Sequence, residues 1–143
     1  MQALGLPAQL LDAHNKLVPT SSLDGYVFGL YFSAHWCPPC RGFTPELAKW
    51  YKNFQDKHPD QKLAIIFISS DRDESSFNEY RKEMNFHALP FSEREVKGAL
   101  STKFGVRGIP TLIFFDATGK VTTKEGRAVV SSDPNGNDYP WDN

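Results

Sequence analysis

The sequence predicts an α/β domain with a central mixed β-sheet flanked by helices. Residues 26–32 and 63–68 form two continuous apolar runs of strand length, with a helical pattern between them. A third apolar run, at 111–115, leads through a turn at 116–120 into a returning stretch at 121–123, which indicates a hairpin. Strands and helices that alternate before a final hairpin are typical of α/β domains with both parallel and antiparallel strand pairs.

The first half of the chain contains four predicted elements. Residues 7–18 predict a short helix followed by an extended piece, and 26–32 predict a buried strand. Apolar residues between 43 and 54 recur on one face of a long helix, which we expect to stop at 58–60 because Pro59 disfavours helical backbone before it. The run at 63–68 predicts a second buried strand.

The second half continues the alternation. Asp71 or Asp73 is expected to cap a helix whose buried face carries the side chains Phe77, Tyr80 and Met84. Residues 89–91 form a link, and a further helix over 96–104 ends at Gly105. After the hairpin, residues 133–138 predict a loop, and 139–141 a docking anchor.

Length and charge favour one domain over residues 1–143, with 1–24 as an N-terminal extension packed on it. The formal net charge is −1 and no Lys/Arg run occurs, so neither nucleic acid nor a membrane is expected as the main partner. No targeting signal or apolar run of about 20 residues is found. We therefore expect a cytoplasmic location with access to the nucleus.

The two cysteines lie in the segment Trp36-Cys37-Pro38-Pro39-Cys40, directly after a predicted strand and at the start of the long helix. A helix N-terminus favours the thiolate form, so we expect Cys37 to be an exposed nucleophile and Cys40 an inward-facing resolving thiol. Pro38 and Pro39 stiffen the turn and remove two N–H donors. The pattern favours a redox-active pair, which needs no other cofactor.

The sequence leaves two other roles open for the cysteine pair, a structural disulfide and a zinc site. A structural disulfide would close only a short loop and constrain the unfolded chain little. A zinc site could take His35 as a third ligand, but no second Cys-x-x-Cys or His-x-x-x-His occurs, so no metal is expected unless two chains share one. A protonated His35 could also favour the Cys37 thiolate.

Residues 31–45 around the cysteines resemble the active-site stretch of the nucleoredoxin and tryparedoxin family, a branch of the thioredoxin superfamily. Residues 109–113, 126–127 and 133–141 also match, so the likeness runs from about residue 25 to the end. It implies the thioredoxin fold and a protein-disulfide reductase. The size of the chain resembles tryparedoxins, but Arg72 and 126–127 favour a single-domain nucleoredoxin-like protein.

The resemblance also implies roles for individual residues. Pro110 would be a cis-proline that leaves the Ile109 backbone free to pair with an extended substrate. Trp36 would form an apolar wall beside the sulfurs, and Arg127 would meet a carboxylate of a small thiol or protein partner, unless it is an ordinary surface arginine. Thioredoxins carry a buried Asp where this chain has Tyr31. Asp71 is our substitute candidate for proton transfer, with a helix N-cap as the alternative.

The expected partners are disulfide-containing proteins and an external electron donor, because no flavin or nicotinamide fingerprint occurs. The donor would be a thioredoxin reductase-like enzyme or a trypanothione-like dithiol. The resemblance to nucleoredoxins also implies an alternative function, a redox-gated binding module for signalling or transcription regulators, with Trp36, Ile109 and Pro110 as its surface. The reduction potential does not follow from the motif, since related proteins span about 150 mV.

Overall fold

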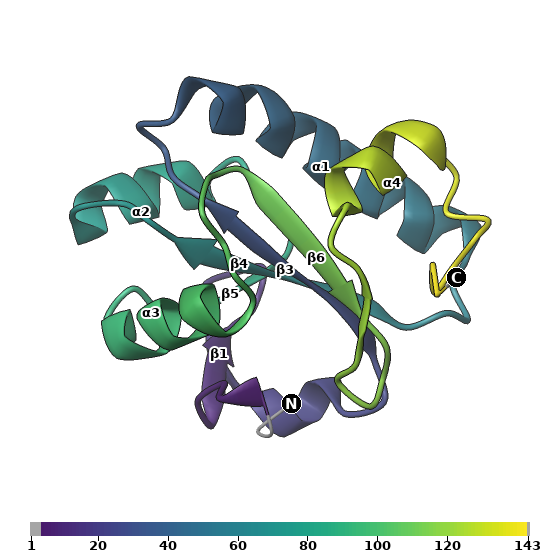
Figure 1. Ribbon diagram of the computed structural model, residues 1–143, viewed down its shortest axis with the longest axis horizontal. Helices are drawn as coiled ribbons and strands as arrows, with labels where there is room; N and C mark the ends of the chain where they lie inside the picture. Colours follow the sequence, from purple (N-terminus) through teal and green to yellow (C-terminus); the bar gives the residue numbers. More distant parts are fainter. Residues whose placement is uncertain (1–3, 143) are drawn as a thin grey trace.

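A mixed sheet forms the centre of the protein (Figure 1). The computed structural model describes residues 4–142, and in that range seven strands pair in the order β2-β1-β5-β4-β3-β6-β7. The strands are β1 (Gln9–Leu11), β2 (Leu17–Pro19), β3 (Val27–Ser33), β4 (Leu63–Ser69), β5 (His87–Ala88), β6 (Thr111–Phe115) and β7 (Val121–Thr123).

The two central strands, β3 and β4, are buried along their whole length. They run parallel, and their register pairs Val27 with Leu63 at one end and Ser33 with Ser69 at the other. Strand β6 lies antiparallel on the other side of β3. Because β3 and β4 end at the same edge of the sheet, the loops that follow them lie next to each other. One of these loops carries Cys37.

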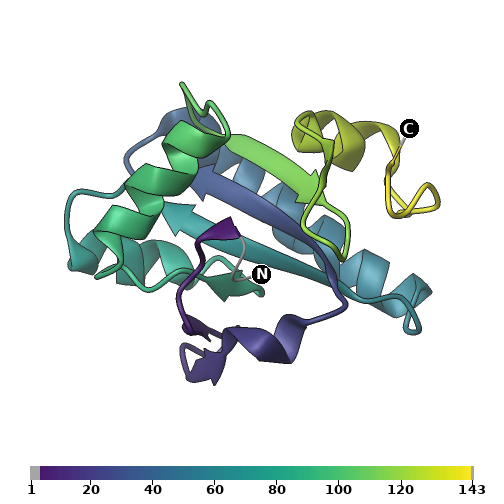
Figure 2. The ribbon, with the colours of Figure 1, turned by 60° about the horizontal axis from the view of Figure 1, so that its bottom comes forward.

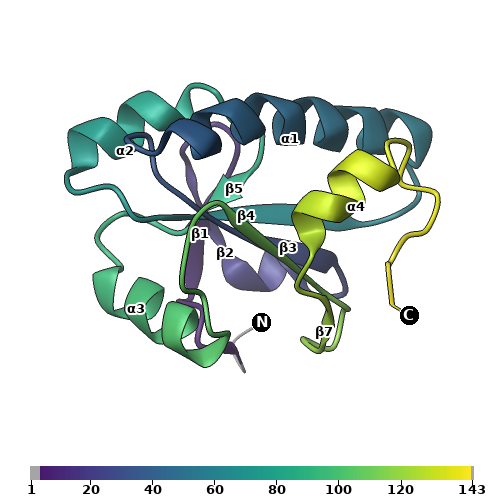
Figure 3. The same ribbon diagram turned by 45° about the horizontal axis from the view of Figure 1, so that its top comes forward.

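Helices cover both faces of the sheet (Figure 3). One face is covered by α1 (Pro38–Lys57), α2 (Glu74–Arg81) and α4 (Gly126–Ser132), which pack an aromatic-rich core. The other face is covered by α3 (Arg94–Lys103), the short 3₁₀ helix η2 (Thr20–Leu23) and the N-terminal segment. Figure 2 views the sheet from this second side. No helix within residues 4–142 is both long and apolar enough to cross a membrane.

Most of the predicted elements are confirmed. The three apolar runs form β3, β4 and β6, and the returning stretch forms β7. Helix α1 carries the predicted buried face and ends with His58 as its C-cap. Helix α3 is followed by Gly105 with φ of +64°, as expected for a glycine after a helix.

The helix predicted within 7–18 is wrong, because this segment forms β1 and β2 as an antiparallel pair. The Asp12 carboxylate accepts hydrogen bonds from the N–H groups of His14 and Lys16, and Asn15 has φ of +62°, which together fix a tight turn. Leu11 pairs with Ala88 of β5, so the N-terminal extension continues the sheet. The prediction that no targeting signal is present rests in part on residues 1–3, which lie outside the described range.

The buried side chain of Arg81 fixes this pair of strands to the domain. Its guanidinium donates to the Asn15 side chain at 2.9 Å, to the Asp12 carbonyl at 2.6 Å and to the Phe86 carbonyl at 2.7 Å. Burial lowers the pKa of Arg81 to about 10, so the group stays charged at neutral pH. These hydrogen bonds replace the water that the charge loses on burial.

The remaining corrections concern short or weakly signalled elements. Helix α4 and the two-residue strand β5 were not predicted. Asp73 caps α2 by accepting the Ser76 N–H at 2.7 Å, so the N-cap reading of Asp71 is wrong, and Met84 lies beyond the end of α2. The C-terminal anchor is confirmed, since Trp141 is buried against the aromatic core.

Candidate active site

The cysteine pair lies where the loop after β3 becomes α1. Cys37 is the N-cap of α1, and its sulfur accepts a hydrogen bond from the Cys40 N–H at 3.4 Å. Pro38 and Pro39 have no N–H, so Cys40 provides the first helical N–H that can reach this sulfur. The sequence therefore leaves one amide donor to the Cys37 sulfur, where a helix without these prolines would have more.

Both thiols are free, and both are buried. Cys37 keeps 5% of its surface exposed and Cys40 none, so the prediction of an exposed Cys37 is wrong. The two residues form a small apolar cluster with Ala34, and Ile109 packs against it. The prediction that Cys40 faces inward is confirmed. A disulfide substrate must therefore reach the small part of Cys37 that is exposed.

The loop before β6 faces the Cys37 sulfur. Its Ile109–Pro110 peptide bond is cis, as the resemblance implied. The Cys37 thiol lies 3.9 Å from the Ile109 carbonyl oxygen, to which it donates a long, weak hydrogen bond. The structure thus brings Ile109 and Pro110 to the cysteine pair from 70 residues further along the chain.

Trp36 is the exposed neighbour of the pair, with 52% of its surface accessible. Its indole N–H donates to the Ser70 carbonyl at 3.0 Å, which ties the ring to the loop after β4. The Arg72 guanidinium lies over the same ring, 5.6 Å from its centroid. Trp36 is therefore a surface tryptophan that is held in place, and it is not part of the core.

Asp71 connects the loops that follow β3 and β4. Its carboxylate accepts the His35 N–H at 2.8 Å and the Ser69 hydroxyl at 2.7 Å. Arg94 lies close enough to interact with this charge. Within residues 4–142 no hydrogen bond joins Asp71 to Cys40. Asp71 thus positions the loop that precedes Cys37, and its role in proton transfer stays a prediction.

Four hydroxyl groups form a buried chain beneath Cys40. Tyr31 is 2.6 Å from Thr44, Thr44 contacts Tyr80, and Tyr80 is 2.7 Å from Ser33. Burial raises the pKa of Tyr31 and of Tyr80 above the ordinary phenol value, so both stay neutral. Tyr31, where the resemblance to thioredoxins implied an Asp, is therefore part of a neutral hydrogen-bonded network.

The Cys40 thiol is hard to ionise. Burial, and after it the neighbouring Cys37 side chain, raises the pKa of Cys40 to about 11. The Ser33 hydroxyl and the Ala34 amide act in the opposite direction by hydrogen bonding, but more weakly. Cys40 is therefore protonated in the reduced protein at neutral pH, and Ser33 links it to the hydroxyl chain.

His35 packs its ring on Tyr80 with 5.2 Å between centroids, and its Nε2 lies 3.8 Å from a Glu83 carboxylate oxygen. In the part of the chain that the structure describes, no group of three or more His, Cys, Asp or Glu residues is arranged to hold a metal ion.

Arg127 lies beside the cis-proline loop. Its guanidinium is 3.5 Å from the Pro110 carbonyl and 5.6 Å from the centre of the Phe43 ring. Gly126 makes this placement possible, because a Cβ there would lie 2.6 Å from the Leu112 carbonyl oxygen. The motif at 126–127 therefore combines a close approach of α4 to β6 with an exposed cation at the site.

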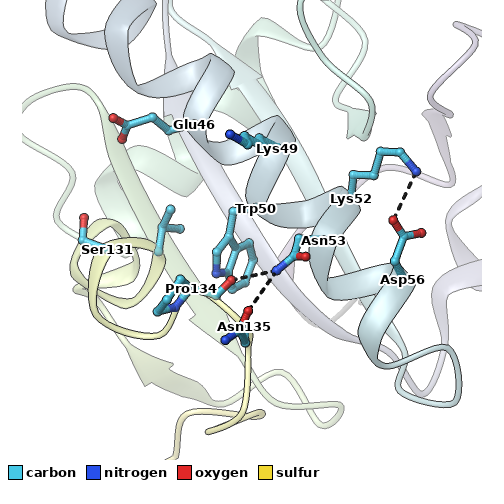
Figure 4. A pocket seen from close by; sticks show the side chains of 10 residues that line it. Glu46, Lys49, Trp50, Lys52, Asn53, Asp56, Ser131, Pro134 and Asn135 are labelled. Atoms are coloured by element: carbon cyan, nitrogen blue, oxygen red, sulfur yellow. Dashed lines mark hydrogen bonds and ion pairs between the residues drawn. The ribbon is translucent and has the colours of Figure 1, made fainter.

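A pocket of about 790 Å³ lies elsewhere, between α1 and the C-terminal segment (Figure 4). Its lining includes neither cysteine. The Asn53 amide crosses it and donates to the Pro134 carbonyl at 3.0 Å. Asn53 thus joins α1 to the C-terminal segment across this pocket.

Sequence reasoning missed Ser33, Thr44 and Tyr80 as parts of the site. Thr44 lies four residues after Cys40, on the same helix face, which is a usable signal. Ser33 lies at the end of β3, four residues before Cys37. Tyr80 comes from α2, 40 residues beyond Cys40, and no local pattern connects the two.

Comparison with known proteins agrees with this geometry. Residues 25–121 match the family model described as thioredoxin-like. Bovine nucleoredoxin is 42% identical over 132 residues, which is 92% of this chain but 30% of the relative. Tryparedoxin of Trypanosoma brucei brucei is 43% identical over 145 residues, covering 97% of this chain and 99% of the relative. The chain thus spans less than a third of nucleoredoxin and almost all of tryparedoxin.

Comparison with solved structures agrees with the sequence comparison. A solved structure of tryparedoxin II in complex with glutathionylspermidine superposes with a TM-score of 0.89 at 34% identity, over 99% of this chain and 97% of the other. The arrangement of sheet and helices is therefore the thioredoxin fold, and the two cysteines occur at the spacing that this fold uses for thiol–disulfide exchange. The chain belongs to the thioredoxin-like family, in the group of oxidoreductases that includes nucleoredoxin and tryparedoxin.

Proposed function

We propose that the protein reduces disulfide bonds in other proteins, with Cys37 as the attacking thiolate and Cys40 as the resolving thiol. The observation that carries this proposal is the asymmetry of the pair. The Cys37 sulfur is the N-cap of α1 and accepts the Cys40 N–H, whereas Cys40 is fully buried behind it with its pKa raised to about 11.

The reaction proceeds in two exchanges. The Cys37 thiolate attacks one sulfur of the substrate disulfide, forms a mixed disulfide with it and releases the other sulfur as a thiolate that takes up a proton. Cys40 then loses its proton and attacks the Cys37 sulfur. The second substrate thiol leaves, a Cys37–Cys40 disulfide remains, and two electrons have passed to the substrate.

The second exchange requires Cys40 to ionise in a buried position. Its raised pKa keeps it from competing with Cys37 in the first exchange. The Ser33 hydroxyl donates to the developing thiolate, and Tyr80 can donate to Ser33 in turn. A chain of hydroxyls that all donate toward one end stabilises negative charge at that end.

The surroundings of the pair suit an extended polypeptide substrate. Trp36 offers an exposed aromatic face, and Ile109 offers main-chain groups beside the cis-proline. Pro38 and Pro39 hold the first turn of α1 rigid. Arg127 is placed to meet a carboxylate of the substrate or of the electron donor.

The oxidised pair must be reduced again by a partner. The redox centre is the Cys37–Cys40 pair itself, and the donor is an external dithiol or a reductase protein. A relative solved in complex with glutathionylspermidine supports a thiol-bearing donor of low molecular weight. The cytoplasmic location inferred from the sequence stays a prediction.

The test is insulin-disulfide reduction with an external dithiol as donor. Cys37→Ser should lower the rate to the background of the donor alone, because no attacking sulfur is left. Reduced Cys40→Ser, mixed with the substrate after the dithiol has been removed, should accumulate a mixed disulfide, seen as an adduct by mass spectrometry under non-reducing conditions. Full activity of Cys37→Ser would refute the assignment.

A second function, redox-gated binding, is favoured by the exposure of Trp36 next to the pair. In this case the oxidation state of Cys37 and Cys40 would control a partner surface without turnover. A pull-down with oxidised and with reduced protein, read together with the insulin assay, separates the two functions. Capture of a partner by one redox state only, together with no insulin reduction by the wild-type protein, would favour the binding module.

A further inference from the structure

Four exposed arginines surround the cysteine pair, and we name them the arginine rim: Arg41, Arg72, Arg107 and Arg127. Arg41 directly follows Cys40, and its N–H donates to the Cys37 carbonyl. Arg72 lies over the Trp36 ring, and Arg127 lies at the Pro110 carbonyl. Arg107 precedes Ile109 by two residues, so the backbones of the two are within about 7 Å.

The rim is not neutralised within the described part of the protein. The ion pairs found in residues 4–142 join His35 to Glu83, Lys52 to Asp56 and Lys82 to Glu79, and none involves a rim arginine. The two carboxylates next to Arg72 in the sequence form hydrogen bonds with other groups. The buried Asp71 carboxylate accepts the His35 N–H and the Ser69 hydroxyl, and the Asp73 carboxylate accepts the Ser76 N–H.

The positive charge of the arginine rim is confined to the surroundings of the cysteine pair. The whole chain has a net charge of −1, so positive charge at the cysteine pair means an excess of negative charge elsewhere. The four cations come from four separate segments: the first turn of α1, the loop after β4, the loop before β6 and the first turn of α4. A single carboxylate pairs with one guanidinium at a time, whereas a polypeptide that carries several carboxylates can pair with several of them.

We propose that the arginine rim selects disulfide substrates whose reactive cysteine is flanked by Asp and Glu residues in the partner polypeptide. This inference rests on the proposed reduction of protein disulfides and adds to it the class of substrate. Guanidinium groups bind carboxylates in paired hydrogen bonds, and a cluster of one sign of charge speeds the approach of an oppositely charged partner. The rim therefore acts on association with the substrate before any sulfur reacts.

Three synthetic peptides with the same disulfide test this proposal, flanked by Glu, by Ser or by Lys residues. We expect the wild-type protein to prefer the Glu peptide over the Lys peptide by about tenfold or more in kcat/KM at low salt. At about 0.5 M salt, where the Debye length falls below about 5 Å, the preference should shrink to about twofold.

Two Arg→Glu substitutions test whether the arginine rim causes the preference for the Glu peptide. Arg72→Glu and Arg107→Glu should each reduce the preference for the Glu peptide by about threefold or more. Arg107 serves as the second variant because no contact with Trp36 is lost with it. Lys57→Glu, at the far end of α1, is the matched control. It lies 17 residues beyond Cys40, or about 25 Å along the helix, and should leave the preference unchanged.

The outcomes separate the two proposals. Turnover of all three peptides with equal kcat/KM, or a preference that Arg72→Glu and Arg107→Glu leave intact, would overturn the arginine rim and leave the reductase standing. If even the Ser peptide is not reduced, the proposed function fails and the inference about its substrates fails with it.

Discussion

The two ends of helix α1 differ in how completely their polar and aromatic groups are used. At the N-terminal end lie two free thiols, an exposed Trp36 and arginines that form no ion pair with a carboxylate of residues 4–142. At the C-terminal end, Trp50 and Phe54 are buried against Trp141, with ring centroids 5.6 and 5.9 Å away. The first end keeps groups available for a partner, and the second end uses its groups to hold the fold.

Asp133 shows how complete the bonding is at the C-terminal end. Its carboxylate accepts hydrogen bonds from the Asn137 N–H, the Asp138 N–H and the Trp141 indole, each at 2.9 Å. Burial by itself would raise the pKa of Asp133, but these donors bring it below the ordinary value. Three of the roughly four acceptor sites of this carboxylate are thus occupied by groups of the protein itself, so Asp133 is a structural group.

The difference teaches that stability and reactivity are located in separate parts of one helix. A change at the packed end should affect the free energy of unfolding, and a change at the cysteine end should affect chemistry. The following predictions compare packed positions with open ones, from the largest expected effect to the smallest.

The same substitution at both ends gives the sharpest comparison. Trp141→Ala should lower the free energy of unfolding by about 3–5 kcal/mol, because it removes a buried ring that stacks on Phe114 at 4.6 Å. Trp36→Ala should lower it by only about 1 kcal/mol, since half of that residue is exposed and one indole hydrogen bond is lost. Urea unfolding followed by circular dichroism measures both values. Similar losses for the two variants would contradict the separation.

Two Gly→Ala substitutions give a second comparison, between a packed position and an open one. Gly126→Ala should destabilise the protein by about 1–3 kcal/mol, because the new Cβ would lie 2.5–2.9 Å from atoms of Leu112. Gly42→Ala lies in α1 with open space around it and should be neutral or stabilising by up to about 1 kcal/mol. Thermal unfolding of the two variants checks the sign of each change. A stable Gly126→Ala would mean that α4 can move away from β6.

The pH dependence of Cys40 alkylation tests the chemistry at the cysteine end of α1. In a Cys37→Ser background, alkylation of Cys40 should rise only well above pH 9, because burial, the largest cause of its raised pKa, persists. Adding Ser33→Ala removes a hydrogen bond that lowers this pKa, so alkylation at pH 9 should slow by about threefold to tenfold.

The raised pKa of Cys40 also predicts how the stability of the protein changes with pH. A thiol whose pKa is raised by folding ionises more readily in the unfolded chain, so stability should fall as pH rises between the ordinary thiol value of 9.0 and about 11. Alkylation of Cys40 that is complete at pH 8 would show that it is not held neutral by the fold.

The sequence predicted the elements whose signal is local and strong. Strands β3, β4 and β6 are apolar runs, and α1 repeats apolar residues over about three turns, so period and length suffice to identify them. It failed for the pair β1–β2, because a turn built on the Asp12 side chain breaks a segment whose apolar residues also fit a helix. It failed for α4 because Gly126 and the β-branched Val129 and Val130 have weak helix propensity, and packing decides there.

By itself the sequence determined that two cysteines sit at a strand-to-helix junction and which residue types flank them, because such patterns depend on neighbours along the chain. Only the tertiary structure decided how deeply Cys37 is buried, how Tyr80 and Ser33 connect to Cys40, and that four arginines surround the pair. These properties depend on loops and helices far apart in the chain, which meet only because β3, β4 and β6 pair in one register.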